Sequence, residues 1–442
     1  MTKLRTTIIG MGLTGQSCIR HLQNDELMVL DTRNNPALIS GLPAHPALSA
    51  HIGVKTWDFR GVDRVVVSPG VALNDSLVLA ARRYDIRLSS DIDLFFDAAR
   101  APVFAITGTN GKSTATAMTG DLLKAAGYRV AVGGNIGDAA LDLLSTEVDY
   151  YVLELSSFQI ERLDIRPLAG AVVLNVTEDH IDRHGSMDTY AATKRRLFKR
   201  SAVVVFNRED PLTRPVGCVS GRVTSFGLDA PSAGSWGIRR DQRETWFVRG
   251  DARCIPVRSL TLPGLHNQEN FLSACAVLDD VSLPAEALHH TASTLKALPH
   301  RCEFVRERRG VRWYNDSKAT NVGATIAAVN GLAPTLGKSG RIVLLAGGDG
   351  KGADFSPLVG LVPMLRGVIL YGRDASRIDK VVNGHVATRH ADDLETAVQD
   401  AAKIAISGDC VLLAPACASL DMFANYGERG RRFVAEVETL PA

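Results

Sequence analysis

Residues 103–114 have the residue types and the spacing of a loop that binds a polyphosphate. An apolar run of strand character, Val103–Ile106, is followed by Thr-Gly-Thr-Asn-Gly-Lys-Ser-Thr and by a helical segment that we expect to begin at Ser113. In such a strand–loop–helix unit, the loop amides and the free N–H groups at the helix start point at one place. There Lys112 would reach the β- and γ-phosphates, and the Ser113 hydroxyl would bind Mg²⁺.

The match to the usual pattern, Gly-x-x-x-x-Gly-Lys-Ser/Thr, is incomplete, because Ile106 occupies the position of the first glycine. The loop is therefore a shortened variant. A glycine-rich turn between a strand and a helix could also serve only to reverse the chain. That alternative explains the glycines, but it does not explain the Lys-Ser-Thr sequence directly after them.

Acidic and imidazole groups follow two further apolar runs of strand character. Tyr150–Leu153 ends on Glu154, where a nucleotide-bound Mg²⁺ would find an oxygen ligand, although a solvated strand end is the alternative. Ala171–Leu174 leads into a loop that carries Asp179 and His180. Because Mg²⁺ prefers oxygen ligands, spacing alone leaves the role of His180 open.

Lys194 lies on a helix that we expect to begin near Asp188 or Thr189. It is one of four basic residues there, and composition alone favours a solvated face.

The N-terminal segment has the pattern of a dinucleotide-binding βαβ unit. Gly10, Gly12 and Gly15 form Gly-x-Gly-x-x-Gly after an apolar strand, and Asp31 follows the second strand. Taken alone this pattern indicates NAD or FAD, so a nicotinamide dehydrogenase is one alternative function and a non-catalytic nucleotide switch is another. The turn would accept any diphosphate at a helix N-terminus, and Asp31-Thr32-Arg33 could hold a different base or ribose.

The rest of the chain predicts α/β structure with one antiparallel addition. Residues 91–102 suggest a hinge, and short alternating runs over residues 222–261 suggest a small antiparallel annex. A helix is expected from Pro263 to about Leu298. After residue 299, polar loops follow strand after strand, which is typical of a doubly wound unit.

Composition limits the class of protein. With 442 residues the chain is long enough for about three domains. Its formal net charge of +2 gives no overall field to attract nucleic acid or a membrane surface. Seven cysteines without paired spacing argue for reduced thiols, and there is neither a charged-then-apolar leader nor an apolar run of membrane-spanning length. We therefore expect a cytoplasmic protein without membrane insertion or a nucleic-acid partner.

Taken together, the motifs resemble those of the Mur ligase family. They occur in one order over nearly the whole chain: Thr-Gly-Thr-Asn-Gly-Lys-Ser-Thr, Glu154 with Ser-Ser-Phe-Gln, Asn-x-x-x-Asp-His, His-Asn-x-x-Asn, His-Arg and Asn-Asp-Ser-Lys-Ala-Thr-Asn. The shortened phosphate loop is the family's own form. Within the family, Gly-Met-Gly-Leu-Thr-Gly, Ser-Pro-Gly-Val-Ala, Gly-Gly-Asp-Gly-Lys and Ser-Leu-Asp-x-Phe are most similar to the members that use UDP-N-acetylmuramoyl-L-alanine and D-glutamate.

The resemblance implies three α/β domains. These would be a Rossmann-like UDP-sugar-binding domain over residues 1–91, a central ATP-binding P-loop domain with the small annex over residues 92–298, and a Rossmann-like amino-acid-binding domain over residues 299–442. It also implies an ATP-dependent peptide ligase that forms an acyl phosphate, and we expect a monomer.

The resemblance further implies a role for individual residues. ATP would be bound by Gly108, Thr109, Asn110, Gly111, Lys112, Ser113, Thr114, Asn267, Asn270, Arg301 and Asp316. The UDP-sugar would be bound by Gly12, Leu13, Thr14, Asp31, Thr32, Arg33, Ser68, Gly70 and Asn135. Glutamate would be bound by Lys318, Thr320, Lys351, Ser419, Leu420 and Tyr426.

The resemblance also implies the catalytic and metal-binding sets. The catalytic residues would be Lys112, Glu154, His180 and Lys194. Two Mg²⁺ ions would be held with the help of Ser113, Glu154, His180 and Lys194, the last as a carbamate formed with CO₂. Only a neutral amine reacts with CO₂, and nearby cations favour loss of the ammonium proton.

Overall fold

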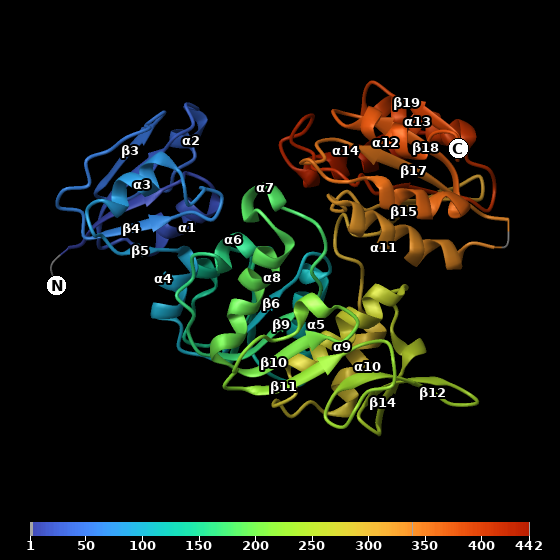
Figure 1. Ribbon diagram of the computed structural model, residues 1–442, viewed down its shortest axis with the longest axis horizontal. Coiled ribbons are helices and arrows are strands. Elements are labelled where there is room, and N and C mark those ends of the chain that lie inside the picture. The colour runs from blue at the N-terminus through green and yellow to red at the C-terminus, as the bar shows by residue number, and fades with distance from the viewer. Residues whose placement is uncertain (1–2, 338, 442) are drawn as a thin grey trace.

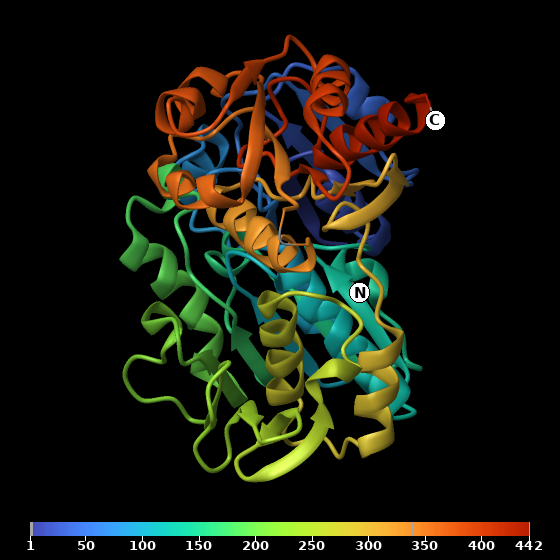
Figure 2. The same cartoon turned by 90° about the vertical axis from the view of Figure 1, so that its right-hand side faces the viewer.

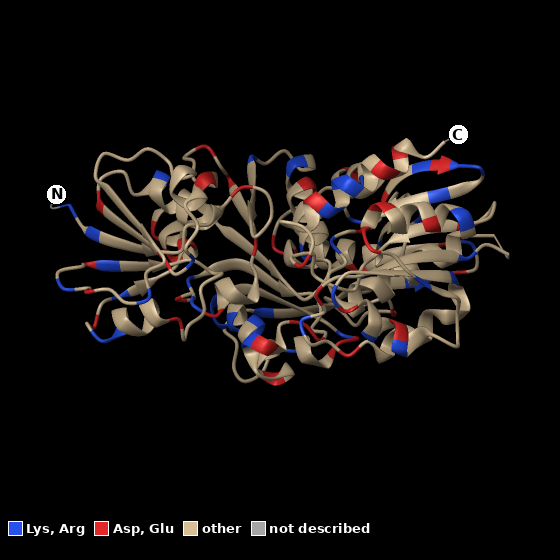
Figure 3. Ribbon diagram, turned by 90° about the horizontal axis from the view of Figure 1, so that it is seen from above, with Lys and Arg blue, Asp and Glu red and all other residues tan. Residues whose placement is uncertain are grey.

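Three α/β units follow one another along the chain, each built around its own sheet. The computed structural model describes residues 3–337 and 339–441. Figures 1 and 2 show the N-terminal and C-terminal units on the same side of the central unit. Figure 3 shows Lys and Arg interspersed with Asp and Glu in all three units. No helix among the described residues combines the length and the apolar character needed to cross a lipid bilayer.

The N-terminal unit is a parallel five-stranded sheet in the order β3-β2-β1-β4-β5. Gly15 packs its helix closely on the first strand, since a Cβ there would overlap the carbonyl oxygen of Gly10. The elements are β1 (Arg5–Ile9), α1 (Leu13–His21), β2 (Glu26–Asp31), α2 (Ala37–Ser40), β3 (Leu48–Ile52), β4 (Arg64–Val67), α3 (Ser76–Arg82) and β5 (Leu88–Ser89).

The segment predicted as a hinge is mostly a helix, α4 (Asp91–Ala98). Ser90 and Asp93 form a capping box at its start, and Ile92 and Phe95 are fully buried. The Phe95 ring packs edge-on against Tyr151 of the central unit, with 5.0 Å between ring centroids. The apolar face of this helix joins the cores of the first two units, and the hinge itself stays a prediction.

The central unit has nine strands in the order β14-β13-β12-β11-β10-β9-β6-β8-β7. Its first half comprises β6 (Val103–Thr107), α5 (Lys112–Ala125), β7 (Val130–Gly134), η1 (Ala140–Leu143), β8 (Tyr150–Glu154), α6 (Ser157–Ile160), β9 (Leu168–Val173), α7 (Ile181–His184), α8 (Met187–Arg195) and η2 (Arg196–Arg200). Its second half comprises β10 (Ser201–Asn207), η3 (Pro211–Thr213), β11 (Arg222–Phe226), β12 (Trp236–Arg240), β13 (Thr245–Arg249), β14 (Ala252–Pro256), η4 (Val257–Ser259), α9 (Leu265–Val277) and α10 (Ala285–Thr294).

Two local predictions for this unit differ from the structure. Antiparallel pairing is confined to β12, β13 and β14, which extend the main sheet, whereas β11 runs parallel to β10. The single helix predicted from Pro263 to Leu298 is two helices, because the chain leaves α9 at Leu278 and Pro284 precedes the start of α10.

The C-terminal unit has six strands in the order β15-β16-β20-β17-β18-β19 and is parallel except for the β15–β16 pair. Its helix α11 lies on the side of the C-terminal unit that is turned toward the central unit (Figure 1). The elements are β15 (Glu303–Arg308), β16 (Val311–Asn315), α11 (Val322–Leu332), η5 (Ala333–Thr335), β17 (Ile342–Gly347), η6 (Ser356–Met364), β18 (Leu365–Tyr371), α12 (Ala375–Val382), β19 (Thr388–His390), α13 (Leu394–Ile404), β20 (Cys410–Leu413) and α14 (Tyr426–Thr439).

Candidate functional site

The predicted phosphate loop connects β6 to α5, whose first residue is Lys112, one residue before the predicted start. Gly111 has a φ of 81°, and a Cβ there would overlap Oδ1 of Asn270, so this position requires glycine. Asn175 Oδ1 accepts bonds from the amides of Thr109 (3.1 Å) and Asn110 (2.8 Å). The loop is thus held from its flank by the strand end beside it.

Lys112 is folded back onto this loop. Its Nζ donates to the carbonyl oxygens of Gly108 (2.9 Å) and Thr109 (2.7 Å). Burial lowers the pKa of Lys112, although the charge of Glu154 opposes that effect. The ammonium therefore lies at the loop where a phosphate would sit.

Glu154 ends β8 and lies beside the loop, because Ile106 of β6 is its register partner. One carboxylate oxygen accepts a 2.6 Å bond from Asn135 Nδ2, and the other is buried without a hydrogen-bond partner. Burial would raise the pKa of this carboxyl, but the charges of Lys112 and Lys318 outweigh it and lower the pKa. A buried anionic oxygen with an open coordination position fits a divalent cation.

Lys194 is almost fully buried, at 1 % exposed, so the solvated-face alternative is wrong. Its Nζ donates to the carbonyl oxygen of Gly108 (2.7 Å) and lies 4.3 Å from the centre of the Tyr190 ring. Burial, and then the charge of Lys112, lower the pKa of Lys194 well below its usual value. The neutral amine is the form that can react with CO₂.

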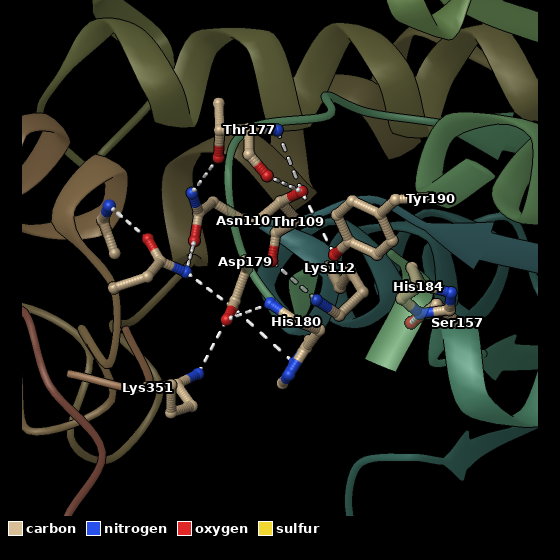
Figure 4. Close-up of polar contacts among 12 residues, drawn as sticks. Thr109, Asn110, Lys112, Ser157, Thr177, Asp179, His180, His184, Tyr190 and Lys351 are labelled. Atoms are coloured by element: carbon tan, nitrogen blue, oxygen red, sulfur yellow. Dashed lines mark hydrogen bonds and ion pairs between the residues drawn. The ribbon is translucent and has the colours of Figure 1, made fainter. Parts of the chain in front are cut away.

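His180 lies close to Lys112 and Asp179 in Figure 4. It has a φ of 56° and its ring packs on Phe158, with 4.8 Å between centroids. Burial lowers its pKa to about 4, so the imidazole is neutral near pH 7. No group of three or more His, Cys, Asp or Glu side chains gathers as a metal site in residues 3–337 and 339–441. The predicted metal set contains only Glu154 and His180 of these types.

A cavity of about 650 Å³ lies between the N-terminal and central units. Asp31 lines it and holds Arg33 through bonds of 2.9 Å and 2.7 Å. All nine residues predicted to bind a UDP-sugar line this cavity: Gly12, Leu13, Thr14, Asp31, Thr32, Arg33, Ser68, Gly70 and Asn135. Its lining also includes the predicted ATP-site and catalytic residues Thr109, Lys112, His180 and Lys194.

The C-terminal unit contacts the phosphate loop directly. Arg301 Nη2 (2.8 Å) and Lys318 Nζ (3.0 Å) both donate to Ser113 Oγ. Lys351 Nζ donates to Asp179 Oδ1 at 2.7 Å, as Figure 4 shows. Two of the residues predicted to bind glutamate, Lys318 and Lys351, therefore reach the central unit.

The other residues predicted for ATP lie on α5, on α9 and after β16. Asn270 Nδ2 lies 3.5 Å from Asn267 Oδ1, one turn apart on α9. Asp316 contacts the Cys302 thiol, and burial raises its pKa to about 6. Thr114 is half-buried on α5.

The remaining residues predicted for glutamate differ in how far they are exposed. The Tyr426 ring lies 5.1 Å from Lys318 Nζ, whereas Leu420 is 71 % exposed. Thr320 is half-buried before α11, and Ser419 is buried.

Three side chains at this site had no role in the sequence analysis. Tyr190 packs under Lys194 and accepts a 3.3 Å bond from Thr109. Asp179 receives Lys351, and Asn321 bonds to both Asp179 and Asn110. Asn321 carried a usable signal, since an asparagine directly before a helical run is a typical N-cap.

Family models cover most of the chain. The Mur ligase MurD-like N-terminal domain matches residues 4–90, the Mur ligase middle domain matches residues 106–278, and the Mur ligase glutamate ligase domain matches residues 300–417. The chain belongs to the Mur ligase family.

Relatives match over nearly their full length. UDP-N-acetylmuramoylalanine--D-glutamate ligase of Pseudomonas syringae pv. syringae is 44 % identical over 438 residues, covering 98 % of this chain and 97 % of that protein. The protein of the same name from Chromohalobacter salexigens is 43 % identical over 440 residues, covering 97 % and 96 %.

Solved structures share the three-domain fold. UDP-N-acetylmuramate-alanine ligase of Thermotoga maritima aligns with a TM-score of 0.65 at 17 % identity, covering 99 % of each chain. The MurF ligase of the same organism, in complex with ADP, aligns with a TM-score of 0.57 at 17 % identity, covering 86 % of this chain and 88 % of that one.

Proposed function

We propose that this chain joins D-glutamate to UDP-N-acetylmuramoyl-L-alanine with cleavage of ATP to ADP and phosphate, a step of peptidoglycan precursor synthesis. The relatives at 44 % identity carry that activity in their names. The observation that carries the proposal is the shared cavity, because the loops suited to a UDP-sugar and Lys112 of the phosphate loop line one space.

The chemistry follows from charge. A carboxylate is a poor electrophile, so the γ-phosphoryl group of ATP is first transferred to the terminal carboxylate of the UDP-sugar substrate, which gives an acyl phosphate and ADP. Lys112 neutralises phosphate charge and positions the group for this transfer. The free amine of D-glutamate then attacks the acyl carbon, the amine loses a proton, and phosphate leaves with the bonding electron pair.

We assign the role of metal ligand to four residues of the predicted site. Ser113, Glu154, His180 and a carbamate on Lys194 would hold two Mg²⁺ ions, and the free buried oxygen of Glu154 supports this assignment. Bound Mg²⁺ would supply positive charge beside the phosphates. His180, with a pKa of about 4, is better suited to donate a ring nitrogen to a metal than to accept the proton of an amine.

Residues of α9 and of the third unit would complete the nucleotide and amino-acid sites. Asn267, Asn270, Arg301 and Asp316 would bind adenine, phosphates and ribose. Lys318, Thr320, Lys351, Ser419, Leu420 and Tyr426 would frame the incoming glutamate. The domain limits 1–91, 92–298 and 299–442, the monomeric state and the cytoplasmic location belong to the same proposal.

Phosphate release with a panel of amino acids tests the proposal. We expect release only when ATP, UDP-N-acetylmuramoyl-L-alanine and D-glutamate are all present, with L-glutamate and the other amino acids inactive. Saturable NADH binding without phosphate release would favour a dehydrogenase. A nucleotide switch would instead bind ATP but show no phosphate release that depends on the UDP-sugar and glutamate.

A further inference from the structure

Asn321 lies between β16 and α11 and is 7 % exposed. Its Oδ1 accepts a 2.8 Å bond from the amide of Ala324, which caps the start of α11. Because its oxygen is turned toward its own helix, its amide nitrogen points the other way. Both N–H groups of Asn321 are therefore directed out of the C-terminal unit.

The amide nitrogen of Asn321 reaches two separate loops of the central unit. Nδ2 donates to Asn110 Oδ1 at 3.2 Å in the phosphate loop and to Asp179 Oδ2 at 3.1 Å in the loop after β9. Asn110 also bonds to Thr177, and Asp179 also receives Lys351, as Figure 4 shows. One side chain thus links the start of α11 to the phosphate loop and to the loop after β9.

The chemical requirement at this position is narrow. An acceptor is needed for the helix start and two donors are needed for the central unit, and an amide supplies both. Ser or Asp would cap α11 about as well as Asn, but neither would supply two donors. A role limited to capping therefore predicts that these substitutions are harmless.

We propose that Asn321 is a positioning residue that couples docking of the C-terminal unit to the conformation of the phosphate loop that receives ATP. Without its amide, Asn110 and Asp179 lose a common donor, and the loop is no longer held from the side of the third unit. The expected effect on kcat/KM rests on the proposed function. The expected effect on the conformation of the phosphate loop does not, because it can be measured without any substrate.

Asn321→Asp and Asn321→Ser separate this role from capping. Both keep the cap, while Asp also places a second carboxylate beside Asp179. For kcat/KM with ATP varied, we expect a loss of about tenfold for Ser and about 100-fold for Asp, within the range of coupling energies between sites. The melting temperature of Asn321→Ser should stay near that of the wild type, since the cap remains.

The double variant Asn321→Asp with Asp179→Asn provides a rescue. Donor and acceptor exchange sides, because an amide at position 179 can donate to a carboxylate at position 321. We expect the double variant to exceed the Asn321→Asp single variant by about tenfold in kcat/KM. Because Asp179→Asn also removes the ion pair with Lys351, the Asp179→Asn single variant is the control. A folded Asn321→Asp variant with wild-type kcat/KM, or a double variant less active than both single variants, would overturn the proposal.

Hydrogen exchange of residues 106–114 in the substrate-free protein gives a second measurement. We expect faster exchange there in Asn321→Ser than in the wild type, and unchanged exchange would contradict the inference. If wild-type protein releases no phosphate with D-glutamate, the proposed function fails, and the exchange result still decides the role of Asn321.

Discussion

The two interfaces of the central unit are built differently. The cavity shared with the N-terminal unit is lined by residues of the first two units, Gly12, Ser68 and Lys112 among them, and no described residue of the C-terminal unit contributes to its lining. The interface with the C-terminal unit instead depends on long cationic side chains, Arg301 and Lys318 on Ser113 among them. We infer that the sugar-nucleotide pocket is preformed, whereas the ATP and amino-acid sites require docking of the third unit.

The phosphate loop lies at the meeting point of both interfaces, so its lysine should matter most. We expect Lys112→Ala to lower kcat for phosphate release by about 10³-fold, because it removes a positive charge aimed at the transferred group. Lys124→Ala, on the exposed face of the same helix, is the matched control and should keep near-normal activity. Near-normal turnover in the Lys112 variant would count against the phosphate-loop assignment.

Lys194 tests the side of the site that faces the sugar-nucleotide cavity. We expect Lys194→Ala to lower kcat by about 100-fold, with partial recovery on adding small carboxylates that replace the carbamate. Lys199→Ala removes an exposed lysine from the next turn and should have no effect. Full activity of the Lys194 variant without added carboxylate would remove the carbamate hypothesis.

Arg33 probes the preformed pocket alone. The Arg33→Ala variant should raise KM for the UDP-sugar by about tenfold and leave KM for ATP unchanged, since Arg33 and its partner Asp31 both belong to the N-terminal unit. Arg60→Ala, which breaks an exposed ion pair with Asp58 in the same unit, is the control. An equal rise in both KM values would show that the two interfaces are not independent.

The fold followed from local pattern more readily than the site did. The apolar runs before residues 107 and 154 and the glycines near residues 10 and 111 predicted parallel α/β structure. Residue types alone predicted that Lys194 lies on a solvated face. The structure buries it, because the exposure of this side chain depends on where α8 packs. The contacts of Asn321 with Asn110 and Asp179 join segments more than 140 residues apart, and no local pattern encodes that docking.

A carboxylate is buried at the junction between the first two units, and its titration should change the stability of the protein. Asp91, at the start of α4, is 2 % exposed, and one of its carboxylate oxygens has no hydrogen-bond partner. Burial raises the pKa of Asp91 to about 6. The folded state therefore binds this proton more tightly than the unfolded state, and stability is lost as the pH rises from about 4 through 6.

Replacement of Asp91 by Asn should remove this loss and leave kcat unchanged. At pH 7.5 the shift from the ordinary value of 3.8 corresponds to at most about 3 kcal/mol of unfolding free energy, so Asp91→Asn should raise the melting temperature. Asp93→Asn is the matched contrast on the same helix, because Asp93 accepts bonds from Ser90 and the amide of Asp164, and its loss should lower the melting temperature. If Asp91→Asn melts below the wild type at pH 7.5, the carboxylate stabilises the junction and the two units are held by charge here as well.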